Sequence, residues 1–140
     1  MNEIKKDLIN VDSCTLAHEI TKVLIEKKAL DVRLYDVKDS AAITDYYVNV
    51  TGRSATHVAS LSDDIDEIIG RRGRAALRIE GKRGNAWILV DYGDVIVNVF
   101  DRESRSFYDF DRLLPTESRV DISELVAEVD KKFELNKGEK

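Results

Sequence analysis

The alternation of apolar and polar residues is clearest over residues 86–100, which read AWILVDYGDVIVNVF. Two apolar runs flank Tyr92-Gly93, and glycine tolerates the positive φ of a tight turn, so the pattern predicts a β-hairpin. With a two-residue loop, Trp87 would lie opposite Asn98. Side chains alternate across a strand, so the hairpin has two unlike faces. One face is purely apolar and consists of Ile88, Val90, Val95, Val97 and Val99. The other mixes aromatic, apolar and acidic side chains: Trp87, Leu89, Asp91, Asp94, Ile96 and Asn98.

The rest of the chain alternates between helical and strand periodicity. The pattern predicts helices beginning near Ser13 or Thr15, near Ser54 and near Asp121, and strands over 32–37, 45–51 and 76–80. We expect the second helix to end at Gly70 and Gly73, and the strand over 76–80 to point Leu77 and Ile79 inward.

The predicted element order is α-β-β-α-β-β-β-α, with a short helix or turn between the hairpin and Pro115. Strands outnumber the helices between them, so we expect an α/β protein with α+β character and a mixed sheet of about five strands. The first two helices should cover the apolar side of this sheet. The opposite side, which is polar and aromatic, is left to the C-terminal tail or to a partner.

Composition and charge narrow the function classes. The chain has 140 residues and a net charge of −5, which argues against a protein that mainly coats nucleic acid. A single cysteine, Cys14, excludes an internal disulfide. No run approaches the length of a membrane span and the N-terminus lacks a secretory apolar segment, so we expect a cytoplasmic protein.

Basic and acidic residues concentrate in neighbouring segments. Residues 71–83 contain Arg71, Arg72, Arg74, Arg78, Lys82 and Arg83, with one acidic residue, Glu80. Residues 91–111 contain six acidic residues and two basic ones. Both segments could be ordinary solvated loops. Alternatively, the acidic end of the hairpin meets a basic protein, and the basic segment, with Arg53 and Ser54, contacts an anion or RNA.

The best candidate for catalysis is the turn Thr51-Gly52-Arg53-Ser54, which precedes the second helix. Nucleotidyltransferases hold phosphate on a Gly-Ser turn of this kind and bind two metal ions with acids at i and i+2 of the next strand. Here Asp91 and Asp94 are three residues apart and straddle a turn. We therefore predict no catalytic residue, no metal site and no cofactor, with a nucleotidyltransferase-like enzyme as the alternative.

Three segments together resemble the ribosomal silencing factor family, also called Iojap-like. They are ITDYYVNVTGRS at 43–54, WILVDYGDVIVNVF at 87–100 and FYDFDRLLP at 107–115. The resemblance implies a single non-catalytic α/β domain over residues 15–115, with a fold distantly like nucleotidyltransferases. Residues 1–14 would then be an N-terminal lead-in and residues 116–140 a C-terminal helical tail.

The resemblance also implies a partner, the large ribosomal subunit, bound through its ribosomal protein 14. Members of the family block joining of the subunits and lower translation when nutrients are scarce. The positions implied to bind the partner are Asp45, Tyr46, Trp87, Leu89, Asp91, Tyr92, Asp94, Asn98 and Tyr108. The chain departs from the family pattern at Asn98, where many members carry histidine, and at Asn49, where an apolar residue is usual.

Several readings stay open at these positions. Trp87 is either an anchor for the partner or a ring packed under residues 107–114 of its own chain. Asp91 either pairs with a basic partner or caps its own turn. Tyr92 is either an exposed residue at the loop tip or part of the turn. The chain could also form a homodimer through the same sheet face or through the tail helix.

Overall fold

The computed structural model describes residues 6–40 and 42–138, with side chains up to residue 134. Its helices are α1 (Ser13–Glu26), α2 (Ala55–Arg71), α3 (Arg102–Tyr108) and α4 (Ser123–Gly138). Its strands are β1 (Leu30–Asp36), β2 (Tyr46–Gly52), β3 (Arg78–Glu80), β4 (Trp87–Asp91), β5 (Val95–Asp101) and β6 (Arg119–Val120). Two 3-10 turns, η1 (Phe110–Leu113) and η2 (Thr116–Ser118), connect α3 to β6.

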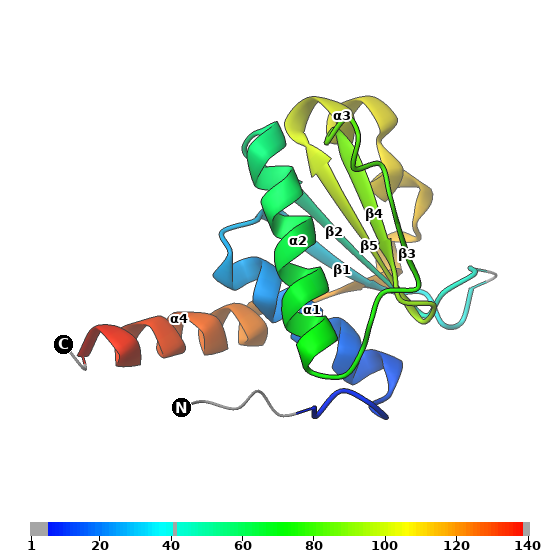
Figure 1. Cartoon of the computed structure of the whole chain (residues 1–140). Coiled ribbons are helices and arrows are strands. Elements are labelled where there is room, and N and C mark those ends of the chain that lie inside the picture. The colour runs from blue at the N-terminus through cyan, green and yellow to red at the C-terminus, as the bar shows by residue number, and fades with distance from the viewer. Residues whose placement is uncertain (1–5, 41, 139–140) are drawn as a thin grey trace.

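The strands form one mixed sheet in the order β3-β4-β5-β2-β1-β6. The central pair β2/β5 is parallel and the other pairs are antiparallel. Helices α1 and α2 cover one face, which we call the inner face, and α3 and η1 lie across the other, the outer face (Figure 1). We call residues 102–113, which comprise α3 and η1, the strap. The mixed α/β class is confirmed, with six strands instead of five.

The inner face is the hydrophobic core, as the alternation of the strands predicts. Both hairpin strands contribute their apolar face, and α1 and α2 contribute one stripe each. The fully buried side chains of this core include Leu16, Ile20, Val58, Leu61, Ile65, Ile69, Val48, Val50, Ile88, Val97 and Val99. The first helix is capped by Asp12, whose carboxylate accepts from the Thr15 N–H at 2.8 Å. The helix begins at Ser13, as predicted, with Asp12 as its N-cap.

The hairpin register differs from the two-residue loop predicted above. Val90 pairs with Val97 and Trp87 with Phe100, so four residues, Tyr92 to Val95, lie between the paired strands. The Asp91 carboxylate accepts from the Gly93 N–H at 2.7 Å, and the Tyr92 N–H donates to the Val95 carbonyl at 2.9 Å. These bonds close a wider turn. The shift is an even number of residues, so both faces of the hairpin stay as predicted.

One further expectation fails at a sheet edge. Leu77 is 73% exposed instead of pointing inward, because β3 begins at Arg78, two residues after the predicted start at residue 76. At the opposite edge, before α4, Arg119 and Val120 pair with Tyr35 and Leu34 as β6, a strand not predicted from the sequence. A two-residue strand is too short to show a period in the sequence.

Helix α4 does not cover the outer face. It packs on α1, where Lys22 lies 3.1 Å from Glu128 and Lys132 lies 2.9 Å from Glu26. Val129 is buried in this contact. The strap, and not the tail, covers much of the outer face: α3 contacts β5 and β2, and the strap ring Tyr108 packs on Trp87 of β4.

Gly52 is required by close packing at the end of β2. A Cβ atom there would lie 2.7 Å from Val58 Cγ2 and 2.8 Å from the Val58 backbone nitrogen. Gly52→Ala should therefore lower the free energy of unfolding by about 1–3 kcal/mol. Gly70→Ala is the matched control, because nothing lies within 4 Å of its Cβ position in helix α2, and it should raise stability by about 0.5–1 kcal/mol. Urea unfolding of both variants measures the two changes in the free energy of unfolding, which should have opposite signs. Equal changes would contradict the close packing at Gly52.

Candidate functional site on the outer face

An apolar, largely aromatic surface lies where the strap meets β4. We call it the aromatic surface and define it by Trp87, Leu89, Phe107 and Tyr108. Phe107 is 79% and Tyr108 53% exposed, whereas Trp87 and Leu89 are half-buried. Large aromatic side chains held at the surface are typical of binding interfaces. This surface is therefore the candidate docking site.

The Trp87 ring is part of the aromatic surface and also packs against other rings of its own chain. Its centroid lies 4.8 Å from that of Phe100, 4.9 Å from that of Tyr108 and 6.2 Å from that of Phe110. Packing under residues 107–114 is thus confirmed through Tyr108 and Phe110. The ring keeps partial exposure beside Tyr108 and Leu89, so packing and docking are compatible.

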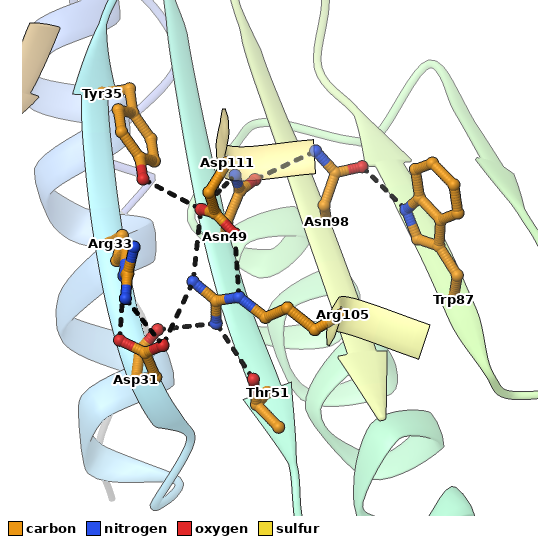
Figure 2. A network of polar contacts seen from close by, with 9 residues as sticks. All are labelled: Asp31, Arg33, Tyr35, Asn49, Thr51, Trp87, Asn98, Arg105 and Asp111. Carbon is orange, nitrogen blue, oxygen red and sulfur yellow. Dashed lines mark hydrogen bonds and ion pairs between the residues drawn. The ribbon is translucent and has the colours of Figure 1, made fainter. Parts of the chain in front are cut away.

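A chain of hydrogen bonds runs across the outer face from Trp87 to β1 (Figure 2). The Trp87 indole N–H donates to Asn98 Oδ1, the Asn98 amide donates to Asn49 Oδ1, and the Asn49 amide donates to Asp111 Oδ1, each at 3.0 Å. Asn49 and Asn98 are register partners in the parallel β2/β5 pair, and both are buried. Asn98 thus hydrogen-bonds within its own chain, and its buried side chain is not accessible to a partner in this structure.

Arg105 anchors the far end of this chain. Its guanidinium donates to Asp111 Oδ2 from Nε at 3.0 Å and to Asp111 Oδ1 from Nη2 at 3.3 Å. Its Nη1 donates to the Asp31 carbonyl at 2.7 Å and to Thr51 Oγ1 at 3.0 Å. Arg105 is buried, with 8% of the residue exposed. A guanidinium has five N–H donors in a fixed fork, and here they hold α3, η1, β1 and β2 together.

The Asp111 carboxylate is the acceptor at the centre of the network. It receives hydrogen bonds from Arg105, Asn49 and the Tyr35 hydroxyl, the last at 2.9 Å. Burial acts to raise the pKa of the Asp111 carboxyl, but the hydrogen bonds and the charge of Arg105 outweigh it, and the pKa is lowered from its ordinary value of 3.8. The network therefore requires the ionised form.

This shift predicts how stability depends on pH. Because the pKa of Asp111 is lower in the folded state than in the unfolded state, its stabilisation is complete above the unfolded value and is lost as the pH falls through the folded value. Asp111→Asn should lower the free energy of unfolding by about 1.5–3 kcal/mol at neutral pH, since hydrogen bonds to a charged group are lost. Urea unfolding at a series of pH values should show this difference shrinking below about pH 4. A difference that stays constant to pH 3 would contradict the role of the charge.

The acidic end of the hairpin is paired within the chain. Asp94 lies 2.9 Å from Arg74, and Asp91 lies 3.1 Å from Arg78 and also caps Gly93. The reading of Asp91 as a turn cap is confirmed. Two of the predicted basic residues thus neutralise two of the predicted acidic ones, which leaves little free charge of either sign at the hairpin end.

Other predicted contact residues are also accounted for within the chain. Arg71 pairs with Glu67, Arg72 with Asp7 and Glu19, and Lys82 with Asp63. Within the described residues, Arg53 and Arg83 are exposed and make no side-chain ion pair. No continuous basic patch emerges from these positions, and contact of Arg53, Ser54, Arg71, Arg72, Arg74, Lys82 or Arg83 with RNA stays a prediction.

Tyr92 and Tyr46 lie in the core, not on the docking face. Tyr92 is 4% exposed and its hydroxyl donates to the Ile65 carbonyl at 3.4 Å, so the expectation of an exposed tyrosine at the loop tip is wrong. Tyr46 is buried on the inner face, where its hydroxyl accepts from Lys38 Nζ at 2.8 Å. Asp45 is half-buried next to the hairpin, and its N–H donates to the Asp94 carbonyl.

The turn considered for nucleotide binding is closed by its own side chains. The Arg53 N–H donates to His57 Nδ1 at 2.9 Å, and the His57 N–H donates to the Ser54 hydroxyl at 3.1 Å. A phosphate there would have to displace both contacts. Over residues 6–40 and 42–138, no group of three or more His, Cys, Asp or Glu side chains could hold a metal ion. No described helix is both long and apolar enough to cross a membrane.

The sequence predicts no role in the site for four residues: Phe107, Arg105, Tyr35 and Asp111. Phe107 lies in the segment expected to form a short helix or turn. Phe107 could have been noted from the aromatic cluster FYDF, which stands out in a charged segment. Arg105 and Tyr35 carry no local signal, because their partners lie up to 76 residues away.

Comparison with known proteins agrees with the resemblance found in the sequence. The family model described as "Ribosomal silencing factor during starvation" matches residues 10–139. The ribosomal silencing factor of Bacillus subtilis is 31% identical over 63% of this chain and 75% of its own length. The mouse protein named "Mitochondrial assembly of ribosomal large subunit protein 1" is 25% identical over 78% of this chain and 50% of its own length.

A solved structure from Bacillus halodurans superposes with a TM-score of 0.65 and 26% identity, covering 79% of this chain and 99% of that one. The fold is thus shared with a solved structure over most of its length. The family model extends beyond residues 15–115 on both sides and takes in β6 and all of α4. The chain belongs to the ribosomal silencing factor family.

Proposed function

We propose that this protein is a non-enzymatic silencing factor that binds the large ribosomal subunit through its ribosomal protein 14. Bound there, it prevents the small subunit from joining and lowers translation when nutrients are scarce. Family membership supports the silencing role, and the name of the mouse relative connects that relative with the large subunit. The aromatic surface is the single structural observation that carries the proposal.

The aromatic surface has the features of a docking site for a protein. Phe107 and Tyr108 are exposed side by side, with ring centroids 5.0 Å apart, and Trp87 supports Tyr108 from below. Burying such rings removes apolar area from water without ordering a flexible chain, because Trp87 and Tyr108 are already held by the strap contacts. Preorganised aromatic anchors of this kind dominate the affinity of many interfaces.

Charge contributes in a different way from that expected from the sequence. Asp91 and Asp94 are paired internally, so they do not offer free carboxylates to a basic partner. The net charge of −5 still attracts a basic ribosomal protein over a distance and raises the rate of association. We therefore assign affinity to the aromatic surface and the rate of encounter to the overall charge.

Co-sedimentation with separated ribosomal subunits tests the proposal. Wild-type protein should pellet with large subunits and not with small subunits. A Phe107→Ser, Tyr108→Ser double variant should stay in the supernatant while remaining as stable as wild type, because both side chains are mainly exposed. Phe133→Ser, which changes an exposed aromatic residue on α4, is the matched control and should pellet normally.

Ribosomal protein 14 is tested separately with the purified protein. Direct binding should be measurable by calorimetry and should be lost in the same double variant. Binding to large subunits without binding to ribosomal protein 14 would place the docking site elsewhere on the subunit. Failure of wild type to pellet with large subunits would contradict the function itself.

No observation favours the enzymatic alternative at Gly52-Arg53-Ser54. The backbone N–H groups of Arg53 and His57 already have acceptors within the chain. Titration with a nucleoside triphosphate and Mg²⁺ should give no heat of binding. Saturable heat that disappears in Ser54→Ala would revive the alternative.

A further inference from the structure

The chain of amides between the strap and Trp87 is directional. An ionised carboxylate only accepts, so Asp111 requires Asn49 to present its Nδ2, which leaves Asn49 Oδ1 facing Asn98. An indole N–H only donates, so Trp87 requires Asn98 to present its Oδ1, which leaves Asn98 Nδ2 facing Asn49. Asp111 at one end and Trp87 at the other therefore favour one and the same arrangement of the two amides. Neither amide can flip alone without losing its hydrogen bonds.

The two asparagines are sealed between the sheet and the strap. Both are buried, and within the part of the chain that the structure describes their side chains hydrogen-bond only to each other and to Asp111 and Trp87. Water therefore cannot replace a lost link. Three hydrogen bonds in series connect the Asp111 carboxylate, on η1, to the indole on β4 (Figure 2).

The hydrogen bond decides which edge of the indole faces outward. Ring packing against Phe100 and Tyr108 fixes the plane of the Trp87 side chain. The terminal torsion of tryptophan is broad, and packing alone does not set the direction of the N–H. The bond to Asn98 Oδ1 points the N–H toward the buried Asn98. The orientation of the indole, whose ring also packs on Tyr108, is therefore set by this bond.

We propose that Asp111, Asn49 and Asn98 form a positioning relay that sets the indole orientation of Trp87 for docking on the large subunit. The inference rests on the proposed function and adds the residues that shape its binding surface. The relay also joins the two halves of that surface, because Tyr108 and Phe107 are carried by the strap that Asp111 holds in place.

A double-mutant cycle on affinity for purified large subunits tests the relay, with Asn98→Leu and Trp87→Phe as the two changes. Asn98→Leu keeps the branched shape of the side chain and removes both hydrogen bonds, and Trp87→Phe keeps an aromatic ring without an N–H. In the Trp87 background, Asn98→Leu should weaken binding by about three- to ten-fold, the effect of one or two lost hydrogen bonds. In the Trp87→Phe background, the same change should alter affinity by less than about two-fold, since a phenyl ring has no edge to select.

Two additions separate positioning from general stability. The chain has one tryptophan, so the emission of Asn98→Leu reports on Trp87 alone and should shift to longer wavelength in the free protein. Ile69→Val removes a methylene group from the buried core of α2 and should lower stability without changing affinity. If Asn98→Leu does not fold, Asn98→Ser takes its place in the same cycle.

The outcomes are distinct. The relay is supported if Asn98→Leu weakens binding only in the Trp87 background and if Ile69→Val binds large subunits with the affinity of wild type. An equal loss in both backgrounds, no loss in either, or a similar loss in Ile69→Val overturns it while the proposed function stands. Absence of binding by wild type overturns the proposed function and the relay with it.

Discussion

Replacing Arg105 by leucine should lower the free energy of unfolding by about 3–5 kcal/mol, the effect of removing one partner from a buried ion pair. Arg105 is buried and holds Asp111, Thr51 and the Asp31 carbonyl with one guanidinium. Without it, the Asp111 carboxylate would stay half-buried with no counter-charge. The strap would also lose its main attachment to β1 and β2.

Arg105→Lys and Arg112→Leu are the matched controls. Lysine keeps the charge but cannot reproduce the fork, so it should recover only part of the stability. Arg112 lies on the same strap, is largely exposed and faces Asp109 at 3.8 Å, so its loss should change stability by less than about 0.5 kcal/mol. Urea unfolding compares the three variants, and equal midpoints for Arg105→Leu and Arg112→Leu would contradict the network as a structural anchor.

Trp87→Ala should weaken binding to large subunits by about 2–4 kcal/mol, roughly 30- to 1,000-fold in the dissociation constant. The change removes the ring that supports Tyr108 and leaves Asn98 Oδ1 without its donor. Some stability is lost as well, because the ring packs on the buried Phe100. Affinity is therefore measured at a temperature where circular dichroism shows the variant fully folded.

Leu77→Ala is the control for Trp87→Ala. Leu77 is an exposed apolar side chain on the same side of the molecule as the hairpin turn, outside the aromatic surface, where its Cδ1 lies near Gly93. It should bind large subunits like wild type. Comparable weakening by both variants would mean that affinity follows general exposed apolar area and not the aromatic surface. Asp91→Lys is unsuitable as a test of docking, since it would break the Arg78 pair and the Gly93 cap.

The hairpin shows what alternation in a sequence can predict. Its inner and outer faces follow from a period of two, which is unchanged by a register shift of two residues. The turn was less predictable, because Tyr92 is pulled into the core and Asp91 closes a wider loop. A glycine beside an aromatic residue indicates a turn without indicating which residues lie inside it.

The network on the outer face lay beyond sequence reasoning. Asn49 and Asn98 are both departures from the family pattern, and Asn98 is also implied to bind the partner. The structure places the two opposite each other in the β2/β5 pair. A buried asparagine is unfavourable by itself, but these two hydrogen-bond to each other because their strands are parallel and in register. The charge pattern suggested free acidic and basic surfaces, which the structure does not show. Segments 71–83 and 91–111 are neighbours in space, and arginines of the first pair with aspartates of the second.

Subunit joining, followed by gradient sedimentation of mixed large and small subunits, tests the central claim most directly. Wild-type protein, incubated with large subunits first, should lower the fraction of joined ribosomes as its concentration rises, and should itself sediment with free large subunits. The Phe107→Ser, Tyr108→Ser variant should leave joining unchanged. Wild-type protein that binds large subunits while the joined fraction stays constant would contradict the account.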